Sequence, residues 1–265
     1  MQADYYKEYY ELERTNWWFT ARKQILRDQL IRLFPRQKNL KILNVGAALG
    51  ASTILLQEFG EVVSIEYSKD CCDFVNQNLG LHFIHGSITE LPFENNSFDL
   101  VCAFDVVEHV QDDLLAVREL HRVCRPGGYT FTTVPTFQAL WSEHDVINEH
   151  VRRYTLRNYL ALFADQPAGI QFRSYFNFFL FPPVAAFRII SSLIKKNNKA
   201  SNVRSDNSKI SGGFISKLLY MIFVSETNFL RKGIRFPIGI SLMVISRKHQ
   251  PAEAPGIGFK PFSSS

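Results

Sequence analysis

The chain has 265 residues, of which 46% are hydrophobic, and this is enough for one sizeable α/β domain with an insertion. Much of the net charge of +5 gathers in residues 195–209, which hold five basic residues and one acidic residue, so the sequence favours no nucleic-acid partner. The four cysteines form no C-x-x-C pair, which argues against a zinc or disulfide framework. The first ten residues lack the apolar core of a secretion signal, and we expect a cytoplasmic location.

Apolar runs alternate with amphipathic stretches between residues 17 and 134. The pattern predicts an amphipathic helix at residues 17–34, ended by Pro35. It then predicts strands at residues 40–45, 62–66, 81–85, 98–104 and 129–134, with helices at 51–59, 70–79 and 114–124 between them. Strands that alternate with helices in this way build a parallel sheet with right-handed crossovers.

The pattern changes after residue 135. A helix is expected from Thr155 to about Ala164, followed by strands at 170–177 and 238–246. Two apolar arms, 178–194 and 214–224, lie between these strands and are separated by a polar, basic segment. Two interpretations stay open for the arms. They form either two helices that pack on each other and on the sheet edge, or an interfacial hairpin with its bases near anionic lipid headgroups.

A turn of small residues follows the first predicted strand. Residues 41–50 read KILNVGAALG, and Glu66 ends the next predicted strand, 20 residues after Gly46. That spacing is typical of an acid that binds a ribose diol. The dinucleotide pattern G-x-G-x-x-G is absent because residues 48 and 51 are alanines, which disfavours an NAD-linked oxidoreductase. The turn therefore predicts a site for a nucleoside without a pyrophosphate.

Further motifs follow in a recognisable order. They are LPFENNSFDLVCAFDVVEHV at 91–110, RELHRV at 118–123 and RPGG at 125–128. Together with the glycine turn they resemble the class I methyltransferases that use S-adenosyl-L-methionine, in particular the small-molecule, type 11-like group. The resemblance is strong over residues 40–134 and weaker over 17–19 and 144–154. It implies a Rossmann-like, doubly wound sheet of seven strands, with the last strand antiparallel. The two apolar arms depart from the family pattern and predict a helical insertion between strands six and seven.

The resemblance also divides the chain into segments. It implies an N-terminal helical cap at 1–39 and a cofactor-binding core at 40–177. An apolar helical insertion with a basic loop is expected at 178–237, the last core strand at 238–248 and a disordered tail at 249–265.

The cofactor site is expected at the carboxyl ends of the strands. The resemblance implies contacts to S-adenosyl-L-methionine from the turn, from the ends of the second and fourth strands and from the loop after the third. These residues are Asn44, Gly46, Ala48, Gly50, Glu66, Tyr67, Ser87, Ile88, Phe104 and Asp105. Asn44, Ala48 and Ser87 depart from the aspartate, glycine and aspartate common in the family.

Candidate bases and acceptor contacts lie in two loops at the same sheet edge. His109, His144 and His150 are candidate general bases because imidazole titrates near neutral pH. The residues expected to contact the acceptor are Trp18, Glu108, Trp141, Asp145, Arg152 and Tyr154. The alternative for residues 141–154 is a region of caps and salt bridges that opens the next helix. Glu108 has no evident partner in the sequence, so no metal site is expected.

The expected activity is methyl transfer to a small molecule. A lipid-linked, quinone or sugar acceptor would suit the apolar arms, which we expect to make peripheral membrane contact if they are interfacial. The altered residues Asn44, Ala48 and Ser87 keep one alternative open, a non-catalytic nucleoside-binding or scaffold domain of the same fold.

Overall fold

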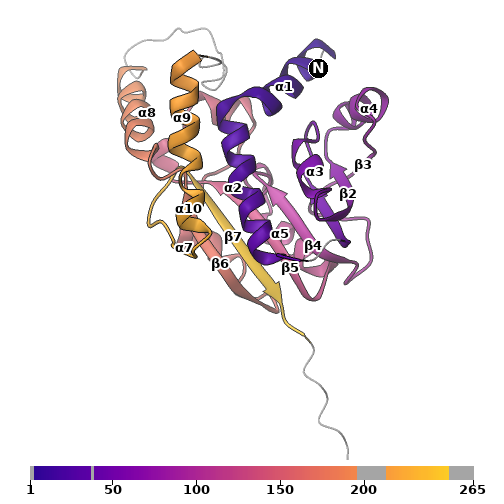
Figure 1. The fold of residues 1–265 in the computed structure, drawn as a ribbon. Coiled ribbons are helices and arrows are strands. Elements are labelled where there is room, and N and C mark those ends of the chain that lie inside the picture. Colours follow the sequence, from indigo (N-terminus) through magenta and orange to yellow (C-terminus); the bar gives the residue numbers. More distant parts are fainter. Residues whose placement is uncertain (1–2, 37–38, 196–212, 251–265) are drawn as a thin grey trace, which may run out of the picture.

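The computed structural model describes residues 3–36, 39–195 and 213–250 (Figure 1). Seven strands form one sheet in the order β3-β2-β1-β4-β5-β7-β6. The strands are β1 Leu40–Val45, β2 Gly60–Glu66, β3 Phe83–His85, β4 Phe98–Phe104, β5 Cys124–Pro135, β6 Ala168–Phe176 and β7 Ser241–Lys248. Strands β1 to β5 are parallel to one another, whereas β7 is antiparallel to both β5 and β6. The predicted fold class is confirmed.

Helices cover the sheet and extend past its edge. They are α1 Ala3–Thr15, α2 Trp17–Leu33, α3 Ala51–Leu56, α4 Lys69–Asn78, α5 Asp113–Val123, α6 Glu143–Ile147, α7 Leu156–Ala161, α8 Phe181–Lys195, α9 Gly213–Val224 and α10 Thr227–Leu230. In Figure 1, α1, α8 and α9 rise beyond the edge of the sheet at which β4 ends. These three helices therefore lie at the edge where ligands bind in open α/β sheets.

The core lies at the centre of the sheet. Strands β1 and β4 are apolar and buried on both faces, as central parallel strands are. Asp99 is the one acid within β4, and its carboxylate accepts a hydrogen bond from the backbone N–H of Lys41 at 2.6 Å. The polar group therefore ties the start of β4 to β1 and does not enter the core.

Several boundaries differ from those predicted. Strand β5 begins at Cys124, five residues early, because Cys124 pairs with Phe98 across an irregularity in the register. Strand β7 occupies Ser241–Lys248, whereas 238–246 was expected, because its pairing with β5 begins at Ser241. Helices α3 and α7 end about three residues earlier than expected. Helices α1, α6 and α10 were not predicted as separate elements.

The insertion between β6 and β7 is helical, as expected. Helix α9 packs along α2, and α8 contacts the short turn Gln138–Leu140. The two arms therefore make their main contacts with other elements and not with each other. No helix within the described ranges is long and apolar enough to cross a membrane. The predicted basic segment at 195–209, apart from Lys195 at the end of α8, lies outside the described residues. Residues 251–265 of the predicted tail do so too.

Candidate cofactor and acceptor site

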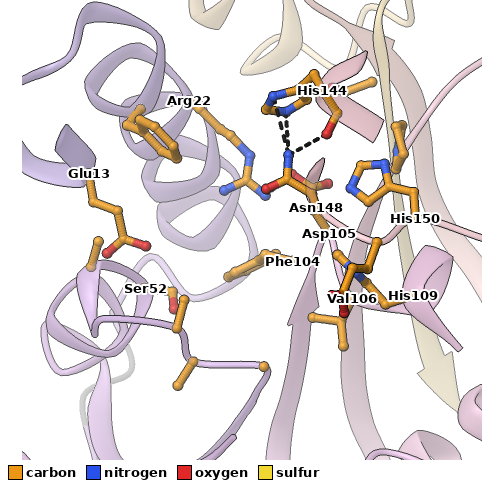
Figure 2. A pocket seen from close by; sticks show the side chains of 18 of the residues that line it. Glu13, Arg22, Ser52, Phe104, Asp105, Val106, His109, His144, Asn148 and His150 are labelled. Atoms are coloured by element: carbon orange, nitrogen blue, oxygen red, sulfur yellow. Dashed lines mark hydrogen bonds and ion pairs between the residues drawn. The ribbon is translucent and has the colours of Figure 1, made fainter. Parts of the chain in front are cut away.

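A cavity of about 1280 Å³ lies at the carboxyl ends of β1, β2 and β4, beneath α1 and α2 (Figure 2). Its wall includes most of the predicted cofactor residues: Gly46, Ala48, Glu66, Tyr67, Ser87, Ile88, Phe104 and Asp105. The candidate bases His109, His144 and His150 and the predicted acceptor contact Trp18 also line it. The topology has therefore brought together residues from segments spread over more than a hundred positions.

The turn after β1 presents its backbone to the cavity. The amides of Gly46 and Ala47 donate to the carbonyl of Ile65 at 2.9 and 3.2 Å, which anchors the turn to β2. Gly46 has φ +67°, and a Cβ there would overlap the side chain of Val106. Ala48 also has a positive φ, 46°, a conformation that costs a residue with a Cβ about 1–2 kcal/mol. The turn thus keeps a glycine-like shape although one glycine of the family pattern is replaced.

Glu66 is held in place by backbone amides. Its carboxylate accepts hydrogen bonds from Ala48 at 3.0 Å and from Ser68 at 3.0 Å. Each carboxylate oxygen has a further lone-pair site, and the side chain lines the cavity. Glu66 therefore has the position and the spare acceptor capacity to bind two ribose hydroxyls.

Ser87 and Ile88 form the wall after β3. Ile88 is buried and apolar, and Ser87 shares a hydrogen bond of 2.8 Å with Thr89 through their hydroxyl groups. Tyr67 stands at the rim with 76% of its surface exposed. An apolar wall with hydroxyl and backbone groups at its edge suits a purine ring.

Asp105 lies at the end of β4 with φ 57°, which turns the chain sharply out of the sheet. Its carboxylate accepts from the hydroxyl of Thr133 at 2.8 Å and pairs with Arg22 of α2 at 2.7 Å. The guanidinium of Arg22 also lies over the ring of Phe104. Arg22 thus brings α2 onto the end of β4 at the floor of the cavity (Figure 2).

Glu13 and Arg22 are among the residues of the cavity wall that were not predicted. Glu13 is 9% exposed, and one of its carboxylate oxygens has no hydrogen-bond partner. Burial raises the pKa of Glu13 to about 7, although Arg14 and the amides of Ala51 and Leu49 favour the charged form. Arg22 follows Trp17-Trp18-Phe19 closely in the chain, and that closeness was a sequence signal for it. Glu13 carries no sequence signal, because only the packing of α1 brings it to the turn.

Two predicted cofactor residues lie behind the wall. Asn44 is buried, and its amide donates to the hydroxyls of Ser52 and Thr53 at 2.9 and 3.0 Å. Gly50 precedes α3 with φ +91° and packs near Leu81. Asn44 therefore holds the turn against α3, and the carboxylate that the family places here is missing from the wall.

The three candidate bases lie close together on the side of the cavity opposite Glu13 (Figure 2). The ring centroids of His109 and His150 are 4.7 Å apart, and those of His144 and His150 are 6.2 Å apart. Burial lowers the pKa of His109 and of His144 to about 4. Both rings are therefore neutral at pH 7, and as bases they are weaker than an ordinary histidine.

Asp145 orients this cluster from behind. It is fully buried, and its carboxylate accepts from Nδ1 of His150 at 2.8 Å and from Nε of Arg153 at 2.7 Å. Burial opposes its charge, but the hydrogen bonds from His150 and Arg153 keep the pKa of Asp145 below its usual value. Asp145 is thus a positioning group for His150 and does not line the cavity.

The other predicted acceptor contacts are not on the cavity wall. Arg152 and Tyr154 both bond to the carboxylate of Asp113, at 2.7 and 2.8 Å. Trp141 is absent from the wall, and Glu108 is fully buried beside His109. For Arg152 and Tyr154 the structure matches the alternative of a salt-bridged region that supports the loop.

These features define a class of protein, the open α/β proteins that bind a nucleoside at the carboxyl edge of a parallel sheet. Residues 43–132 match the family model described as a methyltransferase domain. Demethylmenaquinone methyltransferase of Staphylococcus aureus is 31% identical over 135 residues, which cover 46% of this chain and 54% of that protein. The chain thus spans about half the length of the curated relatives it matches.

Solved structures share the fold at low sequence identity. The YcgJ protein of Bacillus subtilis is 17% identical with a TM-score of 0.52, over 85% of this chain and 99% of that one. The [4+2]-cyclase SpnF is 15% identical with a TM-score of 0.55, over 86% and 81% of the two chains. At such identities the likeness shows the fold alone. Residues 43–132 thus match a methyltransferase domain, on a fold shared with the class I methyltransferases, a family whose cofactor is S-adenosyl-L-methionine.

Proposed function

We propose that the protein transfers the methyl group of S-adenosyl-L-methionine to a hydroxyl oxygen of a small, largely apolar acceptor such as a hydroquinone. The observation that carries the proposal is the continuity of the cavity. It joins the glycine turn and Glu66 at one end to apolar side chains of the insertion at the other. Its volume of about 1280 Å³ exceeds the roughly 300–1,000 Å³ of a pocket for one ligand, so it has room for donor and acceptor together.

The donor half matches the parts of the cofactor. Glu66 accepts the two ribose hydroxyls, and the adenine ring lies against Ile88 beside Ser87. The methionine end carries an ammonium and a carboxylate, which need an anion and a cation. Glu13 and Arg22 supply these charges from α1 and α2, and Glu13 replaces the carboxylate that Asn44 lacks.

The acceptor half is lined by apolar residues. They belong to the start of α8, to α9 and to the segment just before α8: Leu180, Pro183, Val184, Phe187 and Leu219. His109, His150 and Asp105 line the same cavity. The name of the demethylmenaquinone methyltransferase supports a quinone-like acceptor. An apolar ring and tail along the insertion would bring a hydroxyl to the histidines.

The bound cofactor supplies a methyl group activated by the positive charge of its sulfonium. The chain must then align the acceptor oxygen with that methyl, and such positioning can supply about 7–11 kcal/mol of the barrier. It must also remove the hydroxyl proton, for which His109 and His150 are the nearest candidates.

Exposed apolar residues lie on the insertion close to the acceptor half. Phe187, Phe214, Ile215, Leu218 and Met221 are between 41% and 78% exposed. Phe187 also lines the cavity, so this surface is continuous with the proposed acceptor pocket. We propose that it lies on a membrane surface, from which an apolar acceptor enters the cavity.

A test of the activity uses tritiated S-adenosyl-L-methionine with a panel of short-chain hydroquinones and a lipid extract. We expect label in a hydroquinone or lipid product and calorimetric binding of the donor to the protein. Donor binding without any label transfer would favour the alternative, a nucleoside-binding domain without methyl transfer. SpnF, whose name describes a cyclase, shows that the fold alone does not imply methyl transfer.

A further inference from the structure

Three potential ligand groups converge beside the cavity. Glu108, His109 and His150 each offer one ligand atom, and the three atoms lie within 4.8 Å of one another. Glu108 and His109 come from the short 3₁₀ turn after β4, whereas His150 comes from the loop after α6. His109 and His150 are 41 positions apart in the chain, and only the fold brings them together. The arrangement therefore has no signature in the sequence.

Glu108 is the unusual member of this group. It is fully buried, and neither of its carboxylate oxygens has a hydrogen-bond partner among the described residues. Buried polar groups are nearly always hydrogen-bonded, and a buried charge is paired or coordinates a metal. Two oxygens without hydrogen-bond partners, next to two imidazoles, therefore indicate a site suited to a cation.

Hydrogen bonds from neighbouring residues fix the orientation of His150 in this cluster. Nδ1 of His150 lies 2.8 Å from Oδ1 of Asp145, which as a carboxylate accepts the proton of that nitrogen. The lone pair of His150 is then on Nε2. Asp145 is fixed in turn by Arg153, whose Nε and Nη2 donate to it at 2.7 and 2.9 Å. A carboxylate behind a histidine is the arrangement that orients histidine ligands in metal sites.

We propose that Glu108, His109 and His150 bind one divalent ion of the zinc class. Two imidazoles and one carboxylate are the protein ligands of many catalytic zinc sites, which keep a further position open for water or substrate. Magnesium and calcium prefer sets made of oxygen atoms, so two nitrogen ligands disfavour them. His109 and His150 line the cavity, so an ion held by them would be within reach of a ligand bound there.

The role of the ion rests on the proposed function. With the ion bound, His109 and His150 would serve as its ligands and not as bases. The acceptor hydroxyl would bind at the open position and lose its proton to water in the cavity, because the cation stabilises the resulting oxyanion. An oxygen lone pair then attacks the methyl carbon. The C–S bond breaks with its electrons passing to sulfur, so the products are a methyl ether and neutral S-adenosylhomocysteine. The ion undergoes no redox change.

The test measures metal binding directly on the tag-free full chain after dialysis against a chelator. Calorimetry with Zn²⁺ and visible absorption with Co²⁺ report stoichiometry, affinity and ligand type. We expect one ion per chain and about tenfold or more weaker binding in both Glu108→Gln and His150→Gln. His144→Gln is the matched control, because His144 lies near His150 but outside the ligand set, and it should bind the ion as the wild type does.

Donor binding and methyl transfer, measured on the same proteins, separate this inference from the proposed function. Retained donor affinity in Glu108→Gln shows that a loss of metal binding is not unfolding. A wild-type chain that takes up neither ion, or two variants that bind like the wild type, would overturn the site. Transfer at an undiminished rate in chelator would overturn its catalytic role, whereas metal binding without any transfer would overturn only the proposed function.

Discussion

At the residue scale, the donor site depends on carboxylates in two different environments. Glu66 is partly exposed and is held by two backbone amides, so its position is set before a ligand arrives. Glu13 is buried with one oxygen lacking a hydrogen-bond partner, and burial raises its pKa although Arg14 lies 3.8 Å from that oxygen. The two residues are therefore expected to respond differently to substitution and to pH.

Removing the Glu66 side chain tests the ribose contact. We expect Glu66→Ala to weaken donor binding by about tenfold or more, because hydrogen bonds to a charged group contribute about 1.5–3 kcal/mol. Calorimetric titration with S-adenosyl-L-methionine measures this. Glu61→Ala is the matched control, since Glu61 is an exposed acid at the opposite end of β2. Unchanged affinity in Glu66→Ala would remove Glu66 from the site.

The raised pKa of Glu13 predicts a pH dependence of donor binding. An ammonium group binds only the ionised carboxyl, so affinity should rise roughly tenfold from about pH 5.5 to about pH 7 as Glu13 loses its proton. The stability of the free protein should change in the opposite direction. The folded state holds the proton more tightly than the unfolded state, whose carboxyl titrates near 4.5, so stability falls as the pH rises from about 4.5 to about 7.

Glu13→Gln supplies the control for both effects. The variant should bind the donor weakly at every pH and should lose the part of the stability change that this carboxyl causes. Calorimetry and thermal melts at several pH values provide the two readings. A donor affinity in Glu13→Gln that equals the wild-type value, with the same pH profile, would contradict the proposed ammonium contact.

At the element scale, two residues of the turn between β1 and α3 differ in whether they have room for a Cβ. Gly46 cannot accept a Cβ because Val106 packs against it, whereas Ala48 carries a Cβ in a conformation that glycine prefers. We expect Ala48→Gly to leave stability unchanged or raise it by up to about 1 kcal/mol, since relief of backbone strain exceeds the added entropy of the unfolded chain.

Gly46→Ala should have the opposite effect. Its Cβ meets Val106 at a positive φ, and we expect a loss of about 1–3 kcal/mol together with weaker donor binding. Thermal melts of the two variants side by side measure the contrast. Equal destabilisation by both substitutions would mean that the backbone of this turn relaxes, and that its shape does not depend on the glycine.

At the scale of the whole molecule, α8 and α9 carry apolar side chains on the surface near the mouth of the acceptor half. We expect the protein to bind liposomes that contain anionic lipids. The triple substitution Phe214→Ser, Ile215→Ser and Met221→Ser should weaken that binding by about tenfold or more, because each buried apolar side chain contributes about 1.5–3 kcal/mol.

Sedimentation with liposomes measures this binding. Ile54→Ser is the control, because Ile54 is an apolar side chain of similar exposure, 45%, on α3. The triple variant should keep its donor affinity, since these three side chains do not line the cavity. Absence of liposome binding by the unaltered chain would remove the membrane proposal and leave the cavity proposal untouched.

The sequence alone predicted the sheet and most of the donor half. These features are local patterns: the alternation of strands and helices, the small-residue turn, and Glu66 at the end of β2. Local patterns can be recognised without tertiary information. The strand boundaries were less well predicted, because Cys124 and Ser241 join their strands only through pairing with distant segments. The loop at 141–154 was predicted to contact the acceptor. His144 and His150 of this loop line the cavity, whereas the predicted contacts Trp141, Asp145, Arg152 and Tyr154 do not.

The amino-acid sequence by itself determined the class of fold and the nucleoside end of the site, because hydrophobic period and turn chemistry act between near neighbours. Only the tertiary structure decided the rest. Packing of α1 and α2 brought Glu13 and Arg22 to the turn, and the loop after α6 brought His150 to Glu108 and His109. Contacts between segments so far apart in the chain depend on how the elements pack, and no local pattern encodes them.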